Sequence, residues 1–192
     1  MTASISEKKI RNHNPKLLTY DDYVKLTPPD SGNYELHNGK IVFMATPTGI
    51  HQTISMNLSA HIWQYIRPRQ LGRILTAPMD TIFSPHDTLQ PDLLFVSKER
   101  EHIIKKVVDG VPELVVEIKS PSNTRTEMSY KKYVYESTGV REYWYISPKK
   151  QTLTQYENRD GELVRLQVLT INDVLKSFVI EGFEIPLKHI FE

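Results

Sequence analysis

Apolar positions recur every fourth residue in some parts of the chain and alternate with polar positions in others. The clearest helical pattern covers residues 49–67, in which the recurring apolar residues are Ile50, Ile54, Leu58, Ile62 and Ile66. This spacing forms one apolar stripe along an amphipathic helix, which Pro68 is expected to end. Residues 20–26, which follow a threonine cap, and residues 120–139, which end on Gly139, carry further helix signals.

Alternating positions predict an early hairpin and a series of later strands. In residues 33–44, "NYELHNGKIVFM", two strand-like arms flank Asn38-Gly39, a pair suited to a tight type I′ turn. The later strand-like runs, with turn-rich residues 85–88 between the first two, are residues 72–84, 90–97, 112–122, 141–147, 151–158 and 162–169. Residues 98–106 fit a short helix, and residues 179–191 fit a short strand with a closing turn or helix.

This mixture of helices and strands predicts the α/β (or α+β) class. We expect a mixed β-sheet flanked by helices, with the N-terminal hairpin and the C-terminal strands as additions to it. The length of 192 residues fits one domain over residues 17–192, preceded by a flexible tail over residues 1–16. Hydrophobic content of 39% and charged content of 24% are typical of a soluble globular protein.

Charge and cysteine content narrow the functional classes only a little. The formal net charge of +1 does not indicate a nucleic-acid binder, but a local basic patch would suffice for one. The chain has no cysteine, which excludes disulfides, thiolate metal sites and a cysteine nucleophile, and fits a cytoplasmic location. No apolar run approaches the roughly 18 residues that a membrane span needs, so no membrane partner is expected.

The strand within residues 112–122, "PELVVEIKSPS", carries two charges where a buried strand should be apolar. Because side chains alternate along a strand, Glu117 and Lys119 share one face, opposite to Val116 and Ile118. The simplest interpretation is a same-face ion pair at the edge of a sheet, which contributes about 0–1 kcal/mol when exposed. The alternative is a chemical role for both groups.

A second acidic residue, Asp92, stands at the edge of the other hydrophobic strand, 25 positions before Glu117. If the two strands are neighbours in a sheet, Asp92, Glu117 and Lys119 converge at one end. Two carboxylates are suitable ligands for a hard divalent cation. A lysine beside them could orient or deprotonate a water molecule. In outline, a bound cation and such a lysine carry out metal-assisted hydrolysis of a phosphodiester.

These residues resemble the motif of the PD-(D/E)XK nuclease superfamily, with Pro91-Asp92 followed by Glu117-Ile118-Lys119. The surrounding segments, among them "QPDLLFV", "GVPELVVEIKSPSN" and "YKKYVYESTGVREYWYISP", are similar to the Uma-type family of "putative restriction endonucleases". The similarity covers roughly residues 17–192, nearly the whole chain. It implies a restriction-endonuclease-like core, and it implies Mg²⁺ as the cofactor, with Mn²⁺ able to substitute.

The resemblance also implies roles for particular residues. Asp92 and Glu117 would be metal ligands, with the Ile118 carbonyl as a third. Glu35, on the early hairpin, would add a carboxylate. Lys119 would be the catalytic lysine.

The identity of the catalytic lysine stays open at this point. Many relatives have an apolar residue where Lys119 stands and a lysine on the following helix. This chain has both, because Lys131 (or Lys132) is available on that helix. Lys131 is therefore the second candidate.

Each of these residues also has a purely structural interpretation. Asp92 follows a proline and could cap a turn. Glu35 could be a solvated hairpin residue, and His51 could be a helix cap or a group that supports the site. The basic residues of the predicted helix could contact phosphates or only form a solvated face; they are Arg125, Lys131 and Lys132. The tyrosines of "YKKYVYE" and "EYWYIS" could stack on bases, although packing of the helix against the sheet explains them as well.

The sequence therefore predicts a Mg²⁺-dependent DNA endonuclease. A homodimer would suit the cutting of both strands of a duplex. The alternatives are a catalytically silent DNA-binding or regulatory protein on the same fold, a phosphodiesterase that acts on RNA or nucleotides, and a purely structural domain.

Overall fold

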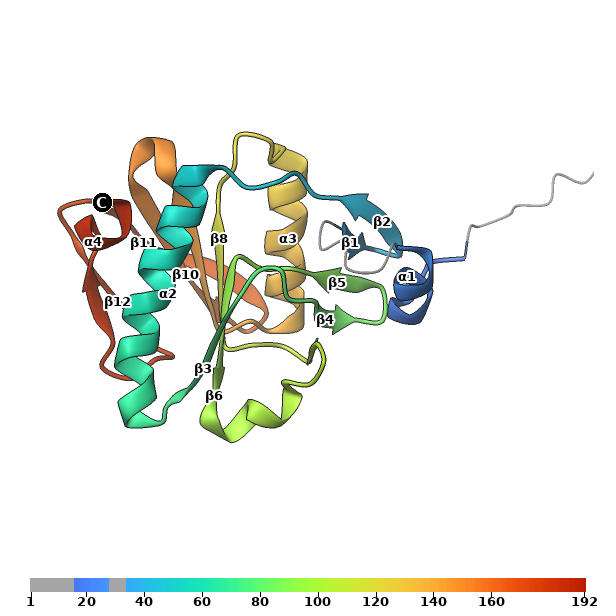
Figure 1. Ribbon diagram of the computed structural model, residues 1–192, viewed down its shortest axis with the longest axis horizontal. Coiled ribbons are helices and arrows are strands. Elements are labelled where there is room, and N and C mark those ends of the chain that lie inside the picture. The colour runs from blue at the N-terminus through green and yellow to red at the C-terminus, as the bar shows by residue number, and fades with distance from the viewer. Residues whose placement is uncertain (1–15, 28–33) are drawn as a thin grey trace, which may run out of the picture.

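The computed structural model describes residues 16–27 and 34–192 and shows a mixed α/β fold (Figure 1). Of the predicted tail, residues 1–15 lie outside the described residues, as do Pro28 and Pro29, which follow the first helix. A six-stranded sheet has the strand order β11-β10-β9-β8-β6-β3, and a five-stranded sheet has the order β2-β1-β5-β4-β7. A short two-stranded sheet, β12-β13, completes the fold.

The six-stranded sheet contains the two strands that carry the predicted site. Its members are β3 (Gly72–Thr76), β6 (Leu93–Ser97), β8 (Leu114–Ile118), β9 (Glu142–Ser147), β10 (Thr152–Arg159) and β11 (Glu162–Thr170). Strands β8 and β9 are parallel, and the other pairs are antiparallel. Strands β6 and β8 are direct neighbours, with Leu93 opposite Val116. The expected mixed sheet is thus confirmed, and the two strands are the neighbours that convergence of Asp92 and Glu117 requires.

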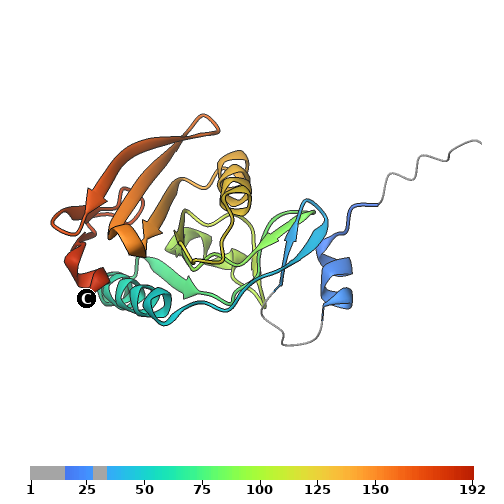
Figure 2. The ribbon, with the colours of Figure 1, turned by 90° about the horizontal axis from the view of Figure 1, so that it is seen from above.

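Helices cover both faces of this sheet because β8 is apolar on both faces. Val116 and Ile118 belong to the cluster that packs under α2 (Gly49–Arg69). Val115 belongs to a second cluster with Tyr135 of α3 (Arg125–Thr138). Figures 1 and 2 show α2 and α3 on opposite sides of the strands. Burial on both faces gives β8 its continuous apolar run.

The five-stranded sheet holds the predicted hairpin. Its strands are β1 (Tyr34–His37), β2 (Lys40–Phe43), β4 (Thr81–Ser84), β5 (Asp87–Leu89) and β7 (Val108–Asp109). Asn38 and Gly39 have φ angles of 46° and 68°, as the type I′ turn between β1 and β2 requires. Residues 87–89, expected partly as a turn, form β5, because this segment pairs with both β1 and β4. The run of residues 72–84 is likewise divided, since β3 and β4 belong to different sheets.

The predicted helices are present with small differences. The buried stripe of α2 contains Ile54, Leu58, Ile62 and Ile66, but Ile50 is about half exposed because the helix starts beyond the edge of the core. Pro68 does not end α2, which continues to Arg69; the left-handed Gln70 ends it instead. Helix α3 ends on Gly139 as expected.

Three short helices complete the element list: α1 (Tyr20–Leu26), the 3-10 helix Lys98–Ile103 and the 3-10 turn Pro148–Lys150. The C-terminal segment forms β12 (Val174–Lys176), β13 (Glu184–Pro186) and α4 (Lys188–Phe191), and α4 packs on α2. Within the described residues, no helix is both long and apolar enough to cross a membrane.

The hairpin turn generates a stability prediction. A Cβ added at Gly39 would lie 2.7 Å from the Leu17 Cβ, whereas one added at Gly161 would meet nothing within 4 Å. Both glycines have positive φ angles, 68° and 87°. Gly39→Ala should therefore lower the free energy of unfolding by about 2 kcal/mol or more, and Gly161→Ala by about 1 kcal/mol. Urea denaturation of both variants measures this, and equal losses would contradict the role given to Leu17.

Candidate functional site

The acidic residues singled out from the sequence converge on one cavity of about 220 Å³ between the two larger sheets. Strand β1 contributes Glu35, the segment before β6 contributes Asp92, and the end of β8 contributes Glu117. The antiparallel register of β6 and β8 explains why Asp92 and Glu117 meet, because each lies one position beyond the Leu93–Val116 pair. The remaining predicted residues that line this cavity are Ile118, Lys131 and His51.

Lys131 lies at the centre of the cluster and is almost fully buried. Its Nζ is 2.9 Å from Glu35 Oε1 and 3.2 Å from Glu117 Oε1. The three side chains are 1–5% exposed, so water screens these ion pairs very little. One lysine of α3 thus links a carboxylate of the five-stranded sheet to a carboxylate of the six-stranded sheet.

Each of these two carboxylates has further hydrogen-bond donors. The Tyr135 hydroxyl donates to Glu117 Oε1. The Gln90 backbone N–H donates to Glu35 Oε1 over 2.8 Å, and His37 Nε2 lies 2.7 Å from Glu35 Oε2. Together these contacts hold both carboxylates in fixed orientations.

Asp92 is bound on the other side of the cavity. Its Oδ2 accepts a hydrogen bond of 2.6 Å from the Ile118 backbone N–H and lies 3.1 Å from His51 Nε2. His51 belongs to the first turn of α2, follows the capping residue Thr48 and is 6% exposed. Its other ring nitrogen, Nδ1, is buried without a hydrogen-bond partner among the described residues.

Burial and the neighbouring charges give the three groups of the cluster different protonation states at neutral pH. Burial, supported by Asp92 and Glu35, raises the pKa of Glu117 to about 8 against the effect of Lys131. Burial also acts to raise the pKa of Glu35, but Lys131 and His37 outweigh it and hold that pKa at about 2. The carboxylates raise the pKa of Lys131 although burial opposes its charge. At neutral pH, Lys131 is therefore a cation, Glu35 is ionised and Glu117 retains a proton.

The pKa of His51 responds in the same way. Burial acts to lower it, but the hydrogen bond and the charge of Asp92, together with the charge of Glu117, raise it overall. This imidazole therefore gains a proton more readily than a free histidine. It then donates to Asp92 through Nε2.

Lys119, the other candidate lysine, lies elsewhere. Its side chain is exposed at the end of β8 and lines a neighbouring cavity together with Lys132, not the cavity of the carboxylates. Alternation along β8 places Lys119 on the face of Glu117, as expected, but the regular strand ends at Ile118. Glu117 is buried against Lys131 whereas Lys119 is exposed, and no ion pair joins the two side chains among the described residues.

Sequence reasoning missed two neighbours of the cluster that simple spacing rules identify. Tyr135 lies four residues after Lys131, so the two side chains share one face of α3 and both reach Glu117. His37 lies two residues after Glu35, so both point to the same side of β1. No such spacing rule identifies the hydrogen bond from the Gln90 backbone N–H to Glu35.

The donors in this cavity suit a hard cation chemically. Carboxylate and carbonyl oxygens are the ligands that Mg²⁺ prefers, and Asp92, Glu117, Glu35 and Ile118 supply both kinds. Across residues 16–27 and 34–192, however, no group of three or more His, Asp or Glu side chains is arranged to hold a metal ion. Lys131 lies between two of the carboxylates, and Asp92 is turned toward His51 and the Ile118 N–H.

Removal of the central lysine should destabilise the fold in a pH-dependent way. Lys131→Met leaves Glu35 and Glu117 buried without a cation, so the free energy of unfolding should fall by about 3 kcal/mol at pH 8. Without the lysine, both carboxyl groups have raised pKa values in the folded state. They therefore take up protons as the pH falls, and the loss should be smaller at pH 5.

Urea denaturation at the two pH values measures this effect. Lys132→Met is the matched control, because Lys132 forms a partly exposed pair with Glu136 and should cost less than about 1 kcal/mol. Equal losses for the two variants would contradict the central role of Lys131.

Comparisons with known proteins agree with this fold. A family model described as "Uma2: Putative restriction endonuclease" matches residues 20–188. Curated protein sequences gave no match. A crystal structure from Anabaena variabilis ATCC 29413, titled as a putative nuclease belonging to DUF820, superposes with a TM-score of 0.77 at 22% identity. The alignment covers 91% of this chain and 97% of that one. The family match spans most of the chain, which therefore belongs to the Uma2 family, described as putative restriction endonucleases.

Proposed function

We propose that this protein is a divalent-metal-dependent endonuclease that hydrolyses phosphodiester bonds of DNA. The observation that carries the proposal is the convergence of Asp92, Glu117 and Glu35 with one buried lysine in a single cavity. These groups come from two sheets and a helix, and packing alone requires no such meeting of charges. Membership of a family described as restriction endonucleases supports the same reaction class.

In this proposal, Asp92 and Glu117 hold Mg²⁺ or Mn²⁺, assisted by the Ile118 carbonyl and by Glu35. A bound ion of this kind polarises the phosphate and lowers the pKa of a water molecule. The protein prepares the donors: His51 and the Ile118 N–H fix the orientation of Asp92, and Tyr135 fixes Glu117. His51 is thus a positioning residue.

Lys131 is the lysine that the geometry favours for catalysis. It is buried beside the carboxylates and remains positively charged, so it can stabilise the negative charge that develops on the phosphate. Lys119 is exposed in the neighbouring cavity and does not line this one. In this proposal, Lys131 of α3 therefore has the catalytic role that the sequence motif suggests for Lys119.

Cleavage of both strands of a duplex needs two such sites or two successive reactions. A homodimer would supply the two sites with two-fold symmetry. The same chemistry also suits RNA, so the choice of substrate is part of the test.

The test is cleavage of supercoiled DNA, linear DNA and RNA with Mg²⁺ or Mn²⁺. Asp92→Ala and Lys131→Met should each lower kcat by about 10²–10³-fold, because each removes a group that stabilises the transition state. Lys119→Ala should change kcat much less. Lys188→Ala, an exposed change on α4 across the sheet, is the control and should cleave like the natural chain.

Three results would contradict this assignment. If Lys119→Ala lowers kcat as strongly as Lys131→Met does, the catalytic lysine is Lys119. If the natural chain cleaves none of the substrates, yet calorimetry shows metal binding that depends on Asp92, the protein is a catalytically silent member of the fold. Cleavage of RNA alone would replace DNA as the substrate.

Metal affinity should depend on pH through Glu117. Its pKa in the metal-free protein is raised to about 8, and a metal ion binds only the ionised carboxylate. Below pH 8 each bound ion must displace one proton, so the apparent affinity should rise about tenfold per pH unit between pH 6 and 8. Above pH 8 it should become constant.

Calorimetric titration with Mn²⁺ in buffers of different ionisation enthalpy measures both the affinity and the proton release. About one proton should leave per ion at pH 7, and almost none at pH 9. An affinity that is constant from pH 6 to pH 8 would show that Glu117 is already ionised.

A further inference from the structure

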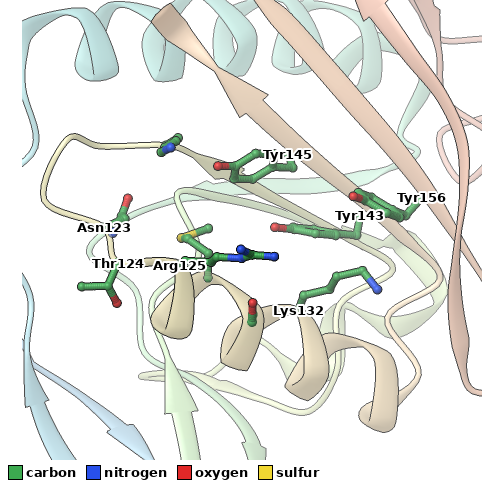
Figure 3. Close-up of a pocket in the computed structure, with 10 residues that line it drawn as sticks. Asn123, Thr124, Arg125, Lys132, Tyr143, Tyr145 and Tyr156 are labelled. Carbon is green, nitrogen blue, oxygen red and sulfur yellow. The ribbon is translucent and has the colours of Figure 1, made fainter. Parts of the chain in front are cut away.

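A second cavity, of about 300 Å³, lies beside the carboxylate site and combines aromatic rings with cations. Figure 3 shows tyrosines from the strands on one side of it and Arg125 and Lys132 from α3 on the other. Its charged and aromatic lining residues are Lys119, Arg125, Lys132, Tyr143, Tyr145 and Tyr156.

Two of the three cations have no ion-pair partner among the described residues. Lys119 and Arg125 are both exposed, and no carboxylate of the described chain lies within ion-pair distance of either one. Lys132 pairs with Glu136 at 3.2 Å and lies 5.2 Å from the centre of the Tyr156 ring. The cavity therefore combines two uncompensated positive charges with a neutralised lysine that lies near an aromatic ring.

The aromatic side of the cavity is a fixed surface. Tyr143 is only 2% exposed, and its ring stacks on Tyr156 with centroids 5.5 Å apart and planes 22° from parallel. The Tyr143 hydroxyl lines the cavity but forms no hydrogen bond with any described residue. This hydroxyl is not among the fully buried polar atoms of the described residues, so it is open to the cavity and available to a ligand. Tyr145, partly exposed on the same strand, adds a second ring and hydroxyl.

The two cavities are adjacent parts of one surface. Asn123 lines both of them. Lys119, one residue beyond the end of β8, follows Glu117 by two positions, about 7 Å at the usual rise of a strand. The neighbouring residues Lys131 and Lys132 of α3 point into different cavities. A strand whose scissile phosphate lies at the carboxylates therefore has its next nucleotide within reach of the second cavity.

We propose that the second cavity binds one unstacked nucleotide of the substrate strand, next to the bond that is cleaved. Lys119 and Arg125 contact its phosphate, and its base lies against the tyrosines, with the Tyr143 hydroxyl as a hydrogen-bond partner. Proteins bind single-stranded nucleic acid by combining cations, which contact the phosphates, with aromatic rings, on which the bases stack. This inference rests on the proposed nuclease function for the identity of its ligand. It assigns Lys119 to substrate binding instead of catalysis.

The test is the binding of a fluorescent 12-nucleotide single strand, and of the matching duplex, followed by anisotropy. Measurement in EDTA and in Ca²⁺ separates binding from cleavage. Lys119→Ala and Arg125→Ala should each weaken binding of the single strand and reduce the slope of log K against log salt by about 0.7, as the loss of one phosphate contact requires. Tyr145→Ala should weaken binding of the single strand roughly tenfold and leave binding of the duplex nearly unchanged.

Two further variants separate a binding role from a structural one. Tyr143→Phe removes only the unpartnered hydroxyl, so it should weaken binding several-fold and leave the midpoint of thermal unfolding unchanged. Lys188→Ala removes one exposed charge on the other side of the sheet and should alter neither the affinity nor the salt slope. Variants of the cavity that bind the single strand as tightly as Lys188→Ala does would overturn the inference, as would a natural chain that binds no oligonucleotide with or without Ca²⁺.

Failure of this inference is distinguishable from failure of the nuclease proposal. If Lys131→Met abolishes cleavage but the cavity variants bind and cleave like the natural chain, only the nucleotide site is wrong. If the natural chain cleaves nothing, yet the cavity variants lose affinity and salt slope as described, the nucleotide site stands and the catalytic proposal fails.

Discussion

The structure depends on one buried cation, Lys131, held between the carboxylates of Glu35 and Glu117. Each carboxylate comes from a different sheet, so the lysine joins the two sheets electrostatically where α3 crosses them. Desolvation makes such a cluster expensive, and an apolar core of the same shape would be as stable or more stable. The cluster is therefore weak evidence for stability, and a chemical task for it is the hypothesis that the proposed function tests. Its protonation pattern follows from the same contacts, because one cation cannot fully neutralise three neighbouring carboxyl groups.

The sheet supplies the geometry that the cation needs. Antiparallel pairing of β6 with β8 brings Asp92 to Glu117, and parallel pairing of β8 with β9 requires the crossover that contains α3. Lysine and tyrosine at positions 131 and 135 then face the same carboxylate. The apolar positions of β8 divide between α2 and α3, so apolar burial alone does not distinguish the two faces. A slip by one residue would instead move Glu117 to the α2 side, away from Lys131.

Much of this arrangement could be predicted from the sequence, and the reasons differ from residue to residue. The β1–β2 hairpin and the two long helices follow from local periodicity and turn chemistry, and the structure confirms them. The pairing of β6 with β8 could be stated from the sequence only as a condition, because periodicity does not say which strands pair. The meeting of Glu35 with Glu117 could not be derived locally, because it depends on how two sheets pack. The position of Lys119 was also beyond local rules. Strict alternation places it on the face of Glu117, but the Lys119 side chain is exposed and lines the neighbouring cavity with Tyr143 and Tyr145, whereas Glu117 is buried against Lys131. The functional roles of these residues stay predictions.

The neighbouring lysines of α3 limit how the length of this chain can change during evolution. Deletion of one residue between Thr124 and Lys131 would rotate the rest of the helix by about 100°. Lys132 would then move into the place of Lys131, and the buried cation would survive. Glu136, however, would replace Tyr135 and add a fourth carboxyl group to a cluster that already holds three. Insertions and deletions in related sequences should therefore be accepted in the loop at residues 119–124 or after Gly139, and should be rare within the first turns of the helix.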